Sequence, residues 1–288
     1  MSKLTIAGIR RENQFSPNHI GNDAAIFSLT AQYLRDLGCE VNEYIESDLI
    51  VLIVRNFEET AIFNMVRNWT SIHKLQQMED QGYTVINSGY GIENCTREKM
   101  TRLLMSNNIS HPASLILPTN EDPTAAMEEA GFYNCWIKRG DFHAIHREDV
   151  TYVRNPEEAK TILKEYAIRG IKTAVINEHL VGDLVKFYGV TGTDFFYWFY
   201  PSNQHHSKFG LEQINGTAKG IPFNDSKLQQ LCSQAAEVLN IHVYGGDCIV
   251  SEDGSIRLID FNDWPSFAPC RDEAAPQIAR RIYNLINK

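Results

Sequence analysis

Two aspartates near the C-terminal end of the sequence have the spacing needed to hold a metal ion. Asp247 and Asp260 flank two short apolar runs joined by Asp253-Gly254, a preferred two-residue hairpin turn. Such a turn would place the two aspartates directly opposite each other. Asn262 would project from the same face as Asp260, because side chains alternate along a strand. The two expected strands are Cys248 to Glu252 and Ser255 to Ile259.

Carboxylates that face each other across a strand pair repel, and a divalent cation between them reverses the sign of that interaction. Mg²⁺ prefers hard oxygen ligands, commonly one or two carboxylates together with phosphate oxygens and water. The alternative is an exposed hairpin with its acids on the solvent side. The apolar frame of the hairpin and the neighbouring segment Trp264-Pro265-Ser266-Phe267 reduce the weight of that alternative. From the hairpin alone, a metal site at Asp247, Asp260 and Asn262 and a solvent-exposed hairpin stay equally open.

Residues 1–90 show alternating strands and helices, the pattern of a small parallel α/β domain. Asn22 is a predicted cap for a helix whose apolar residues recur every three or four positions, and Gly38 is its predicted stop. A second helix is expected around Ala61 to Glu79. The expected strands are Leu4 to Ile9, Cys39 to Tyr44, Leu49 to Val54 and Thr84 to Asn87.

The rest of the chain mixes helices and strands in a different order. Asn155-Pro156-Glu157-Glu158 predicts a helix start, because it offers a cap, a proline at the first helical position and acids in the first turn. Asp225 is expected to cap another helix. Further helices are expected at Arg97 to Ser106, after Asp122-Pro123 and at the C-terminal end, and strands at Leu115 to Leu117, Phe132 to Lys138, Val150 to Val153, Thr173 to Glu178, Leu184 to Val190 and Phe195 to Tyr200.

Several segments, taken in order, resemble the landmarks of the ATP-grasp superfamily, in particular its glutathione synthetase-like and ribosomal-protein glutamate ligase-like members. Tyr244-Gly-Gly-Asp247, the hairpin and Ile259 to Phe267 resemble the metal-binding end of that family, where a motif of the form D…(D/E)xN…P holds Mg²⁺ on the phosphates of ATP. Two earlier segments, Val85 to Pro112 and Cys135 to Lys138, are similar to the regions that carry the first and the second lysine of the family. Val175 to Leu180 is similar to the hinge strand that contacts adenine. Gly182 to Tyr188 is similar to the segment that binds ribose and the terminal phosphate.

The resemblance implies the α+β grasp architecture, an α/β fold in three parts. A small parallel α/β domain would span residues 1–90, a first ATP-grasp subdomain 91–174, and a C-terminal subdomain with the metal site 175–288. It also implies that Asp247, Asp260 and Asn262 bind one or two Mg²⁺ ions, with Mn²⁺ as a second choice, and it implies a set of ATP-binding residues. Lys99 and Lys138 would pair with phosphates, Asp183 would bind the ribose hydroxyls, and Lys186 would neutralise charge on the transferred phosphoryl group together with Lys138. Glu178, together with the backbone of Asn177, His179 and Leu180, would contact adenine.

The sequence departs from the family pattern at three places. The glycine-rich loop after the second lysine is replaced by Arg139 to His146, which contains one glycine, so backbone amides cradle phosphate less readily there. Lys186 stands where arginine is usual and lacks its bidentate fork. Pro265-Ser266 replaces the usual Pro-Gly. A catalytically inactive or altered member of the family is therefore an open alternative.

Candidate residues for binding the substrates come from further regions of the chain. Arg10 and Arg11 end the first strand, where open α/β sheets often place ligands, and Ser16 and Asn18 follow them. Histidines of the glycine-poor loop could hold phosphate or substrate, although solvated loop histidines are an equal alternative. The remaining candidates are His143 and His146 of that loop, His205, His206 and Lys208 of a polar segment that could line the acceptor site, and Ser266 beside the hairpin.

The composition of the chain limits the classes of partner that this protein is expected to bind. The 288-residue chain has a formal net charge of −9, which disfavours nucleic acid as a partner. No apolar run approaches the roughly 20 residues that span a bilayer, and none near the first residues is long enough for a signal peptide. The six cysteines form no CxxC pair, so neither zinc nor a disulfide framework is indicated. We expect a cytoplasmic protein with small-molecule substrates and no membrane partner. The oligomeric state stays open, with a homodimer as one option.

The expected function is an ATP- and Mg²⁺-dependent ligase that joins a carboxylate to an amine or thiol through an acyl-phosphate, on a small-molecule or peptide substrate. One alternative keeps the ATP site but phosphorylates a hydroxyl of a small polyol phosphate such as an inositol phosphate. Another is a nucleotide-binding regulatory protein without turnover. Neither the acid nor the acceptor can be read from the sequence.

Overall fold

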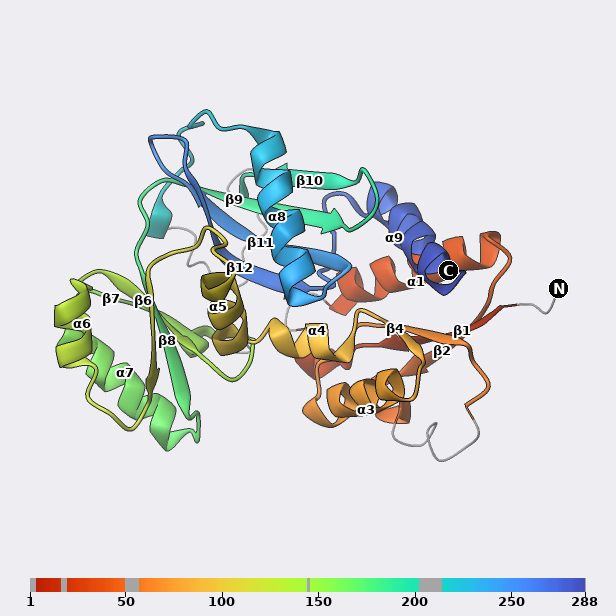
Figure 1. Ribbon diagram of the computed structural model, residues 1–288, viewed down its shortest axis with the longest axis horizontal. Coiled ribbons are helices and arrows are strands. Elements are labelled where there is room, and N and C mark those ends of the chain that lie inside the picture. Colours follow the sequence, from red (N-terminus) through yellow and green to blue (C-terminus); the bar gives the residue numbers. More distant parts are fainter. Residues whose placement is uncertain (1–3, 17–19, 50–56, 144–145, 202–213, 288) are drawn as a thin grey trace.

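The computed structural model describes residues 4–16, 20–49, 57–143, 146–201 and 214–287. Within these ranges, the strands form three sheets of four strands each (Figure 1). Each sheet and the helices that pack on it form one part of the molecule, and we call these parts the N-terminal domain, the central unit and the C-terminal unit. In Figure 1 the N-terminal domain and the central unit lie at opposite ends, and the C-terminal unit lies between them. The prediction of a parallel α/β domain followed by two α+β units is confirmed.

The N-terminal domain is built on a parallel sheet with the strand order β2-β1-β3-β4. Helices cover it because parallel strands need crossover connections, which bring helices onto the faces of the sheet. Its strands are β1 (Thr5–Arg10), β2 (Glu40–Ile45), β3 (Ala61–Asn64) and β4 (Thr84–Ile86), and its helices are α1 (Ile20–Asp36) and α3 (Trp69–Asp80), with short 3₁₀ turns at Asn13–Phe15 and Glu46–Asp48.

The prediction of one helix from Ala61 to Glu79 is wrong in its first part. Ala61–Asn64 is strand β3, and every residue in it is buried. A strand that is covered on both faces has no alternation of apolar and polar residues, so periodicity cannot separate it from a buried helix. The helix begins only at Trp69, after Asn68 caps it by accepting the Thr70 N–H. The strand predicted at Leu49 to Val54 lies almost wholly outside the described residues.

Helix caps agree with the sequence at one place and differ at two. Asn155 caps α7 (Pro156–Ile168) as predicted, with its side chain accepting the Glu158 N–H at 2.9 Å. Asn224, and not Asp225, caps α8 (Asp225–Leu239), since its side chain accepts from the Lys227 N–H. Helix α1 begins two residues before Asn22, whose side-chain oxygen instead accepts from Arg271.

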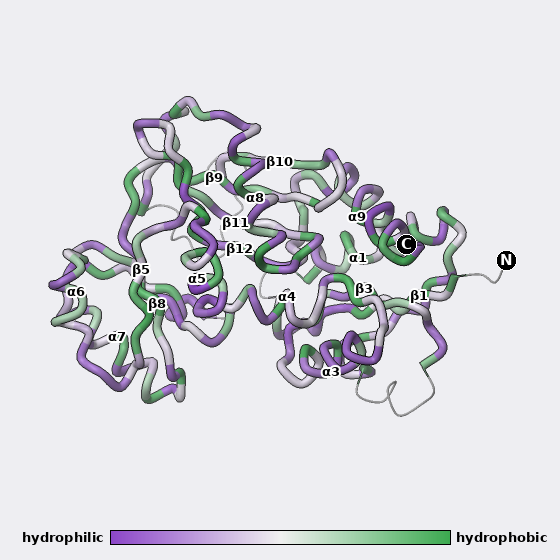
Figure 2. Tube along the Cα trace, in the orientation of Figure 1, coloured by the Kyte–Doolittle hydropathy of each residue, from purple (hydrophilic) through white to green (hydrophobic). Residues whose placement is uncertain are grey.

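The central unit is an antiparallel sheet with the order β5-β8-β6-β7, covered by two helices. Its core, which includes Met127, Ile137, Leu163, Tyr166 and Ile176, is made of residues from this unit. Much of the trace around α6 and α7 is hydrophilic (Figure 2). The elements are β5 (Ser114–Pro118), α6 (Thr124–Ala130), β6 (Cys135–Arg139), a 3₁₀ turn (Arg147–Asp149), β7 (Val150–Val153), α7 and β8 (Thr173–Glu178).

The C-terminal unit is a second antiparallel sheet, with the order β10-β9-β11-β12. Helix α8 packs on it, and α5 joins the same core through Met100 and Leu104. The hairpin predicted from the sequence is β11–β12. The elements are α5 (Arg97–Ser106), β9 (Asp183–Val190), β10 (Phe196–Phe199), α8, β11 (Val243–Val250), β12 (Ile256–Asp263) and α9 (Arg271–Ile286). The short helix α4 (Gly89–Asn94), which precedes α5, packs on α3 and joins the core of the N-terminal domain through Ile92.

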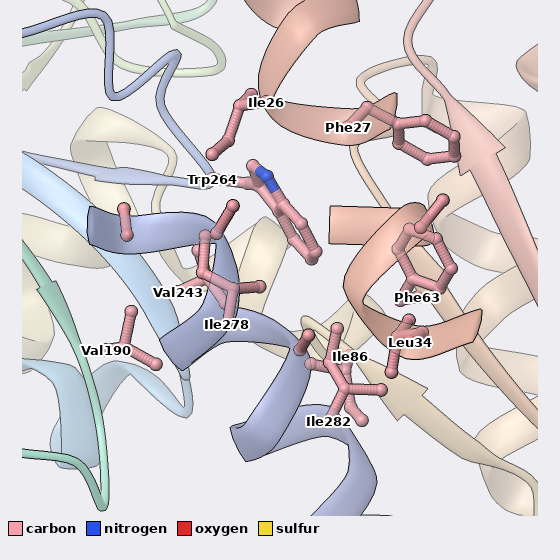
Figure 3. Packing of buried hydrophobic residues seen from close by; sticks show 14 of the residues in the cluster. Ile26, Phe27, Leu34, Phe63, Ile86, Val190, Val243, Trp264, Ile278 and Ile282 are labelled. Atoms are coloured by element: carbon pink, nitrogen blue, oxygen red, sulfur yellow. The ribbon is translucent and has the colours of Figure 1, made fainter. Parts of the chain in front are cut away.

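The N-terminal domain and the C-terminal unit share one hydrophobic core. Trp264 lies in the middle of it, surrounded by side chains from both parts (Figure 3), and stacks on Phe63 with the ring centroids 5.9 Å apart. Helices α1 and α9 pack against each other around this core. Asn87 adds a polar link, because its side chain accepts the N–H groups of His242 and Val243 and donates to the Val243 carbonyl. The N-terminal sheet is thus attached directly to the start of β11.

Candidate active site

The β11–β12 hairpin places its two aspartates opposite each other by a route that the sequence did not predict. Near the turn, Val250 pairs with Ile256, and the Ser251 N–H donates to Ser255, so the loop has three residues, 252–254, instead of two. A bulge then shifts the register at Ile259, and Asp247 pairs with Asp260. The extra residue in the loop and the extra residue in the bulge cancel. The predicted pairing of the aspartates is therefore confirmed, although the predicted turn is wrong.

Glycines in β11 let the neighbouring strand come close. A Cβ at Gly246 would lie 2.2 Å from the carbonyl oxygen of Asp260, and one at Gly245 would lie 2.5 Å from Tyr188. No real Cβ contact is that short, so glycine is required here for close backbone approach. The strand segment that carries Asp260 is consequently fixed tightly against the one that carries Asp247.

A cavity of about 330 Å³ opens over this hairpin, between the three parts of the molecule. This volume is at the lower end of the roughly 300–1,000 Å³ of small-molecule sites. Its walls come from the sheets of the central and C-terminal units and from the loops of the N-terminal domain. The predicted site residues that line it are Arg11, Ser16, Lys138, His143, Asn177, Glu178, Leu180, Lys186, Asp247, Asp260, Asn262 and Ser266.

Cations from three different elements face the two aspartates. Arg97 Nη1 at the start of α5 lies 2.7 Å from Asp260 Oδ1, and Lys186 Nζ on β9 lies 3.0 Å from Asp247 Oδ1. Lys138 Nζ donates to the carbonyl of the bulged Ile259 at 2.7 Å. The repulsion between the carboxylates is therefore relieved by side chains of the protein itself.

Burial and charge shift the pKa values of this group in opposite ways. Burial, followed by the nearby Arg97, lowers the pKa of Lys138 to about 8, although Asp260 and Asp247 act against this. For Asp260, burial favours the neutral acid, but Arg97, Lys138 and a hydrogen bond from Asn262 outweigh it and lower its pKa. Asp260 is therefore an anion at neutral pH, as a metal ligand must be.

The donor set suits a hard cation that shares its ligands with phosphate. Asp247, Asp260 and Asn262 provide carboxylate and amide oxygens, which Mg²⁺ prefers. In the part of the chain that the structure describes, no three histidine, cysteine or acidic side chains converge on one point. The protein alone thus offers an incomplete shell for a metal, and the remaining ligands would have to come from a nucleotide and water.

The opposite end of the cavity has the chemistry of a nucleobase site. Trp136, Leu180 and Ile249 give it apolar walls, and Asn177 and Glu178 bring polar groups. Glu178 Oε1 accepts the Ala113 N–H at 2.8 Å and pairs with Arg257, so its position is fixed from two sides. The side chain of His179 does not line the cavity. It accepts from Trp136 Nε1 at 3.1 Å and packs edge-on to Tyr152.

Lys99, predicted to contact phosphate, points away from the cavity. Its side chain is 49% exposed and pairs with Glu93. The cavity is instead reached by Arg97, which the sequence reasoning missed. Two residues along a helix are about 200° of rotation, so Arg97 and Lys99 must lie on opposite faces of α5. Arg97 shares its face with Met100, Thr101 and Leu104, all buried, and this spacing was a signal for an inward-facing residue.

Asp183, predicted to bind ribose, holds the backbone instead. Its two carboxylate oxygens accept the N–H groups of Lys219 and Ile221, at 2.7 and 2.8 Å. The side chain is buried and does not line the cavity. The residue therefore anchors the segment before α8, and its oxygens are already occupied.

The third end of the cavity lies against the N-terminal domain and contains two buried arginines. Arg11 pairs with Asp23 at 2.9 Å and also donates to the carbonyls of Met65 and Trp264. Arg67, which the sequence reasoning missed, forms an ion pair with Asp263 and donates to its carbonyl at 3.0 Å. Burial lowers the pKa of Arg67 well below its usual value. Ser16 donates to Asp23 and lines the same end.

The other predicted substrate residues are placed elsewhere or are not described. Arg10 pairs with Glu43 and lies over the Phe27 ring, outside the cavity. His146 is exposed, and its backbone N–H donates to Asp149. Asn18, His205, His206 and Lys208 lie outside the described residues. All six cysteines are free and buried, and no helix in the described ranges is long and apolar enough to cross a membrane.

The three sheets, with the cavity between them, have the arrangement that the resemblance to the ATP-grasp superfamily implied. No known protein-family profile matches the sequence, and no curated protein matches it in sequence. Solved structures do match. D-alanine–D-alanine ligase from Bacillus anthracis, complexed with ATP, has a TM-score of 0.73 and 12% identity over 98% of this chain and 97% of that one. D-alanyl-alanine synthetase A from Vibrio cholerae has a TM-score of 0.71 and 11% identity, covering both chains fully. The Coxiella burnetii D-alanine–D-alanine ligase has a TM-score of 0.69 and 13% identity, over 99% and 96%.

Proposed function

We propose that this protein is an ATP-dependent ligase that activates a carboxylate as an acyl-phosphate and joins it to an amine or a thiol. The observation that carries the proposal is the convergence of Arg97, Lys138 and Lys186 on the Asp247–Asp260 pair, inside the cavity of an ATP-grasp fold. Support also comes from the similar Bacillus anthracis ligase, whose structure contains ATP.

In the first half-reaction, an oxygen of the substrate carboxylate attacks the γ-phosphorus of ATP, and ADP leaves. In the second, the amine nitrogen attacks the acyl carbon, phosphate leaves, and the nitrogen loses a proton to solvent or to a side chain. Phosphoryl transfer depends mainly on positioning and on stabilising charge. Lys138 and Lys186 are the catalytic residues for that role, and Arg97 is the third cation.

Asp247, Asp260 and Asn262 would hold Mg²⁺ at the phosphates, with Mn²⁺ as the second choice. The metal would neutralise charge on the phosphoryl oxygens. The chain's own residues do the remaining work. Asn177, Glu178 and Leu180 line the base end, and Trp136 covers it from the side. The backbone beside His179 stays a candidate for contact with adenine.

The end of the cavity that lies against the N-terminal domain would hold the substrate acid, and we call it the acid end. Its charges suit a single carboxylate better than a polyphosphate. Among the residues that the structure describes there, Arg11 and Arg67 are the cations, and each already faces an aspartate. An inositol phosphate would need several cations in excess of the acids. A single carboxylate, in contrast, can share the remaining N–H groups of two fixed guanidinium groups. This end therefore favours the ligase over the polyol-phosphate kinase, and Ser16 and Ser266 supply neutral hydrogen-bonding groups.

The test is trapping of the acyl-phosphate. The protein is incubated with ATP, Mg²⁺, a panel of amino acids, dipeptides and other small acids, and hydroxylamine. Formation of a hydroxamate in step with ADP is the expected result for at least one acid. A stable phosphate ester of a polyol would show that the kinase assignment is correct instead. Nucleotide binding with no ADP release over the whole panel would indicate a regulatory protein and overturn the proposal.

A further inference from the structure

The segment that follows β6 crosses from the central unit to the N-terminal domain. The Phe142 ring is buried between Phe15 and Trp69, with centroids 6.2 and 6.0 Å away. Both of these partners belong to the N-terminal domain, whereas Phe142 belongs to the central unit. Arg139 adds a cation over the Phe142 ring at 6.0 Å. This segment replaces the glycine-rich loop that the sequence lacks, and an aromatic contact fixes it.

The docking of Phe142 brings the next residue to the acid end of the cavity. His143 lines the cavity, and its Nε2 lies 3.3 Å from Arg67 Nη1. A guanidinium nitrogen can only donate, so Nε2 accepts from Arg67 when the ring proton is on Nδ1. The same Nη1 pairs with Asp263, whose Oδ1 lies 3.6 Å from His143 Nε2, and Arg67 Nη2 donates to the Asp263 carbonyl. Arg67 is thus held both by a residue of the C-terminal unit and by a residue of the crossing segment.

We propose that residues 139–143 form a strap that closes the acid end of the cavity, in which Phe142 docks the strap and His143 positions Arg67 for the substrate carboxylate. This inference rests on the proposed ligase function. An acyl-phosphate reacts with water unless the site excludes it. A strap held by a buried aromatic ring excludes water and also completes the binding site for the acid, so closure and acid recognition depend on the same two residues.

The first test uses Phe142→Ala, with Tyr133→Ala as the matched control. Tyr133 is an exposed aromatic residue of the same unit. Hydrogen exchange of the 139–143 amides should rise in Phe142→Ala and stay unchanged in the control. This measurement needs no turnover, so it decides the docking role even if no acid substrate is found. Unchanged exchange in Phe142→Ala would overturn the proposal. If that variant fails to fold, Phe142→Leu is measured in the same way.

The second test measures how tightly ATP consumption is coupled to formation of the ligated product. In Phe142→Ala, the ratio of ADP released to ligated product should rise by at least about tenfold, because misplaced closure admits water to the intermediate. His143→Ala should raise KM for the acid more than it lowers kcat. His143→Gln should recover part of this loss, since its amide oxygen can also accept from Arg67. Equal ADP and product in Phe142→Ala, or an unchanged KM in His143→Ala, would contradict the strap while leaving the ligase assignment intact.

Discussion

Arg97 Nη1 lies 2.7 Å from Asp260 Oδ1, which joins the first residue of α5 to the strand that carries the predicted metal ligands. Both side chains are largely buried, so this pair is screened less than an ion pair at the surface. A metal that approaches Asp260 must share the carboxylate with Arg97. In the proposed nucleotide complex, the phosphates would attract both the metal and Arg97 and so allow that sharing. Arg97 is thus part of the proposed nucleotide site, together with Lys138 and Lys186.

Exchange of Arg97 for methionine should strongly reduce ATP use, and the same exchange at Lys99 should not. Arg97→Met removes a positive charge beside the phosphates and is expected to lower kcat/KM for ATP by about tenfold to a thousandfold. Lys99→Met loses an exposed ion pair worth less than about 1 kcal/mol. Steady-state ADP release measures both variants. A larger defect in Lys99→Met would restore the sequence-based assignment.

Asp260→Asn should abolish Mg²⁺-dependent ATP use while the fold survives. The amide keeps the size of the side chain but loses the charge that a divalent cation requires, and a loss of at least about a hundredfold is expected. Circular dichroism provides the control for folding, and Mn²⁺ binding followed by electron paramagnetic resonance reports on the metal. Near-normal ADP release from a folded Asp260→Asn protein would rule out this metal site.

ATP affinity should fall as the pH rises above about 8. Lys138 attracts phosphate only in its protonated form, and its pKa is lowered to about 8 by burial and by Arg97. Bound phosphates favour that form, so affinity is greatest below this pH and declines as the free protein loses the proton. Calorimetry from pH 7 to 10 should show the decline in the natural protein. Lys138→Met should bind more weakly at pH 7 and show a flat profile. A decline that persists in the variant would point to another group.

Asp183→Ala should affect stability more than nucleotide binding. It removes the acceptor of two partly buried N–H groups, those of Lys219 and Ile221, at a cost of about 0.5 to 1.5 kcal/mol for each. Denaturant unfolding measures the loss, with the exposed Asp194→Ala as the control. The reverse result, normal stability with a weakened affinity for ATP, would show that Asp183 binds ribose after all.

Much of the fold could be predicted because local signals agreed with it. Asn155 and the proline after it specified the start of α7, and the strands of all three sheets were largely found as apolar runs. Asp247 and Asp260 were paired correctly because two register errors cancelled. Ala61–Asn64 could not be assigned, since a strand buried on both faces carries no period that distinguishes it from a helix.

The acid end of the cavity could not be predicted in the same way. Arg67 and Asp263 are separated by 196 positions and meet only when the N-terminal domain packs on the C-terminal unit. No local pattern marks either residue. Arg97 differs, because its spacing from Met100, Thr101 and Leu104 already indicated that it lies on the buried face of α5. A resemblance that emphasised lysine drew attention to Lys99 instead.

The distribution of the cores determines which parts of the molecule can move. The N-terminal domain and the C-terminal unit share the core around Trp264, whereas the core of the central unit is its own. The central unit should therefore move as a rigid body relative to the other two parts, with the two chain crossings, 106–114 and 178–183, as the hinge. Nucleotide exchange would then require the Phe142 ring to leave its place between Phe15 and Trp69, so this aromatic contact would stabilise the closed form of the molecule.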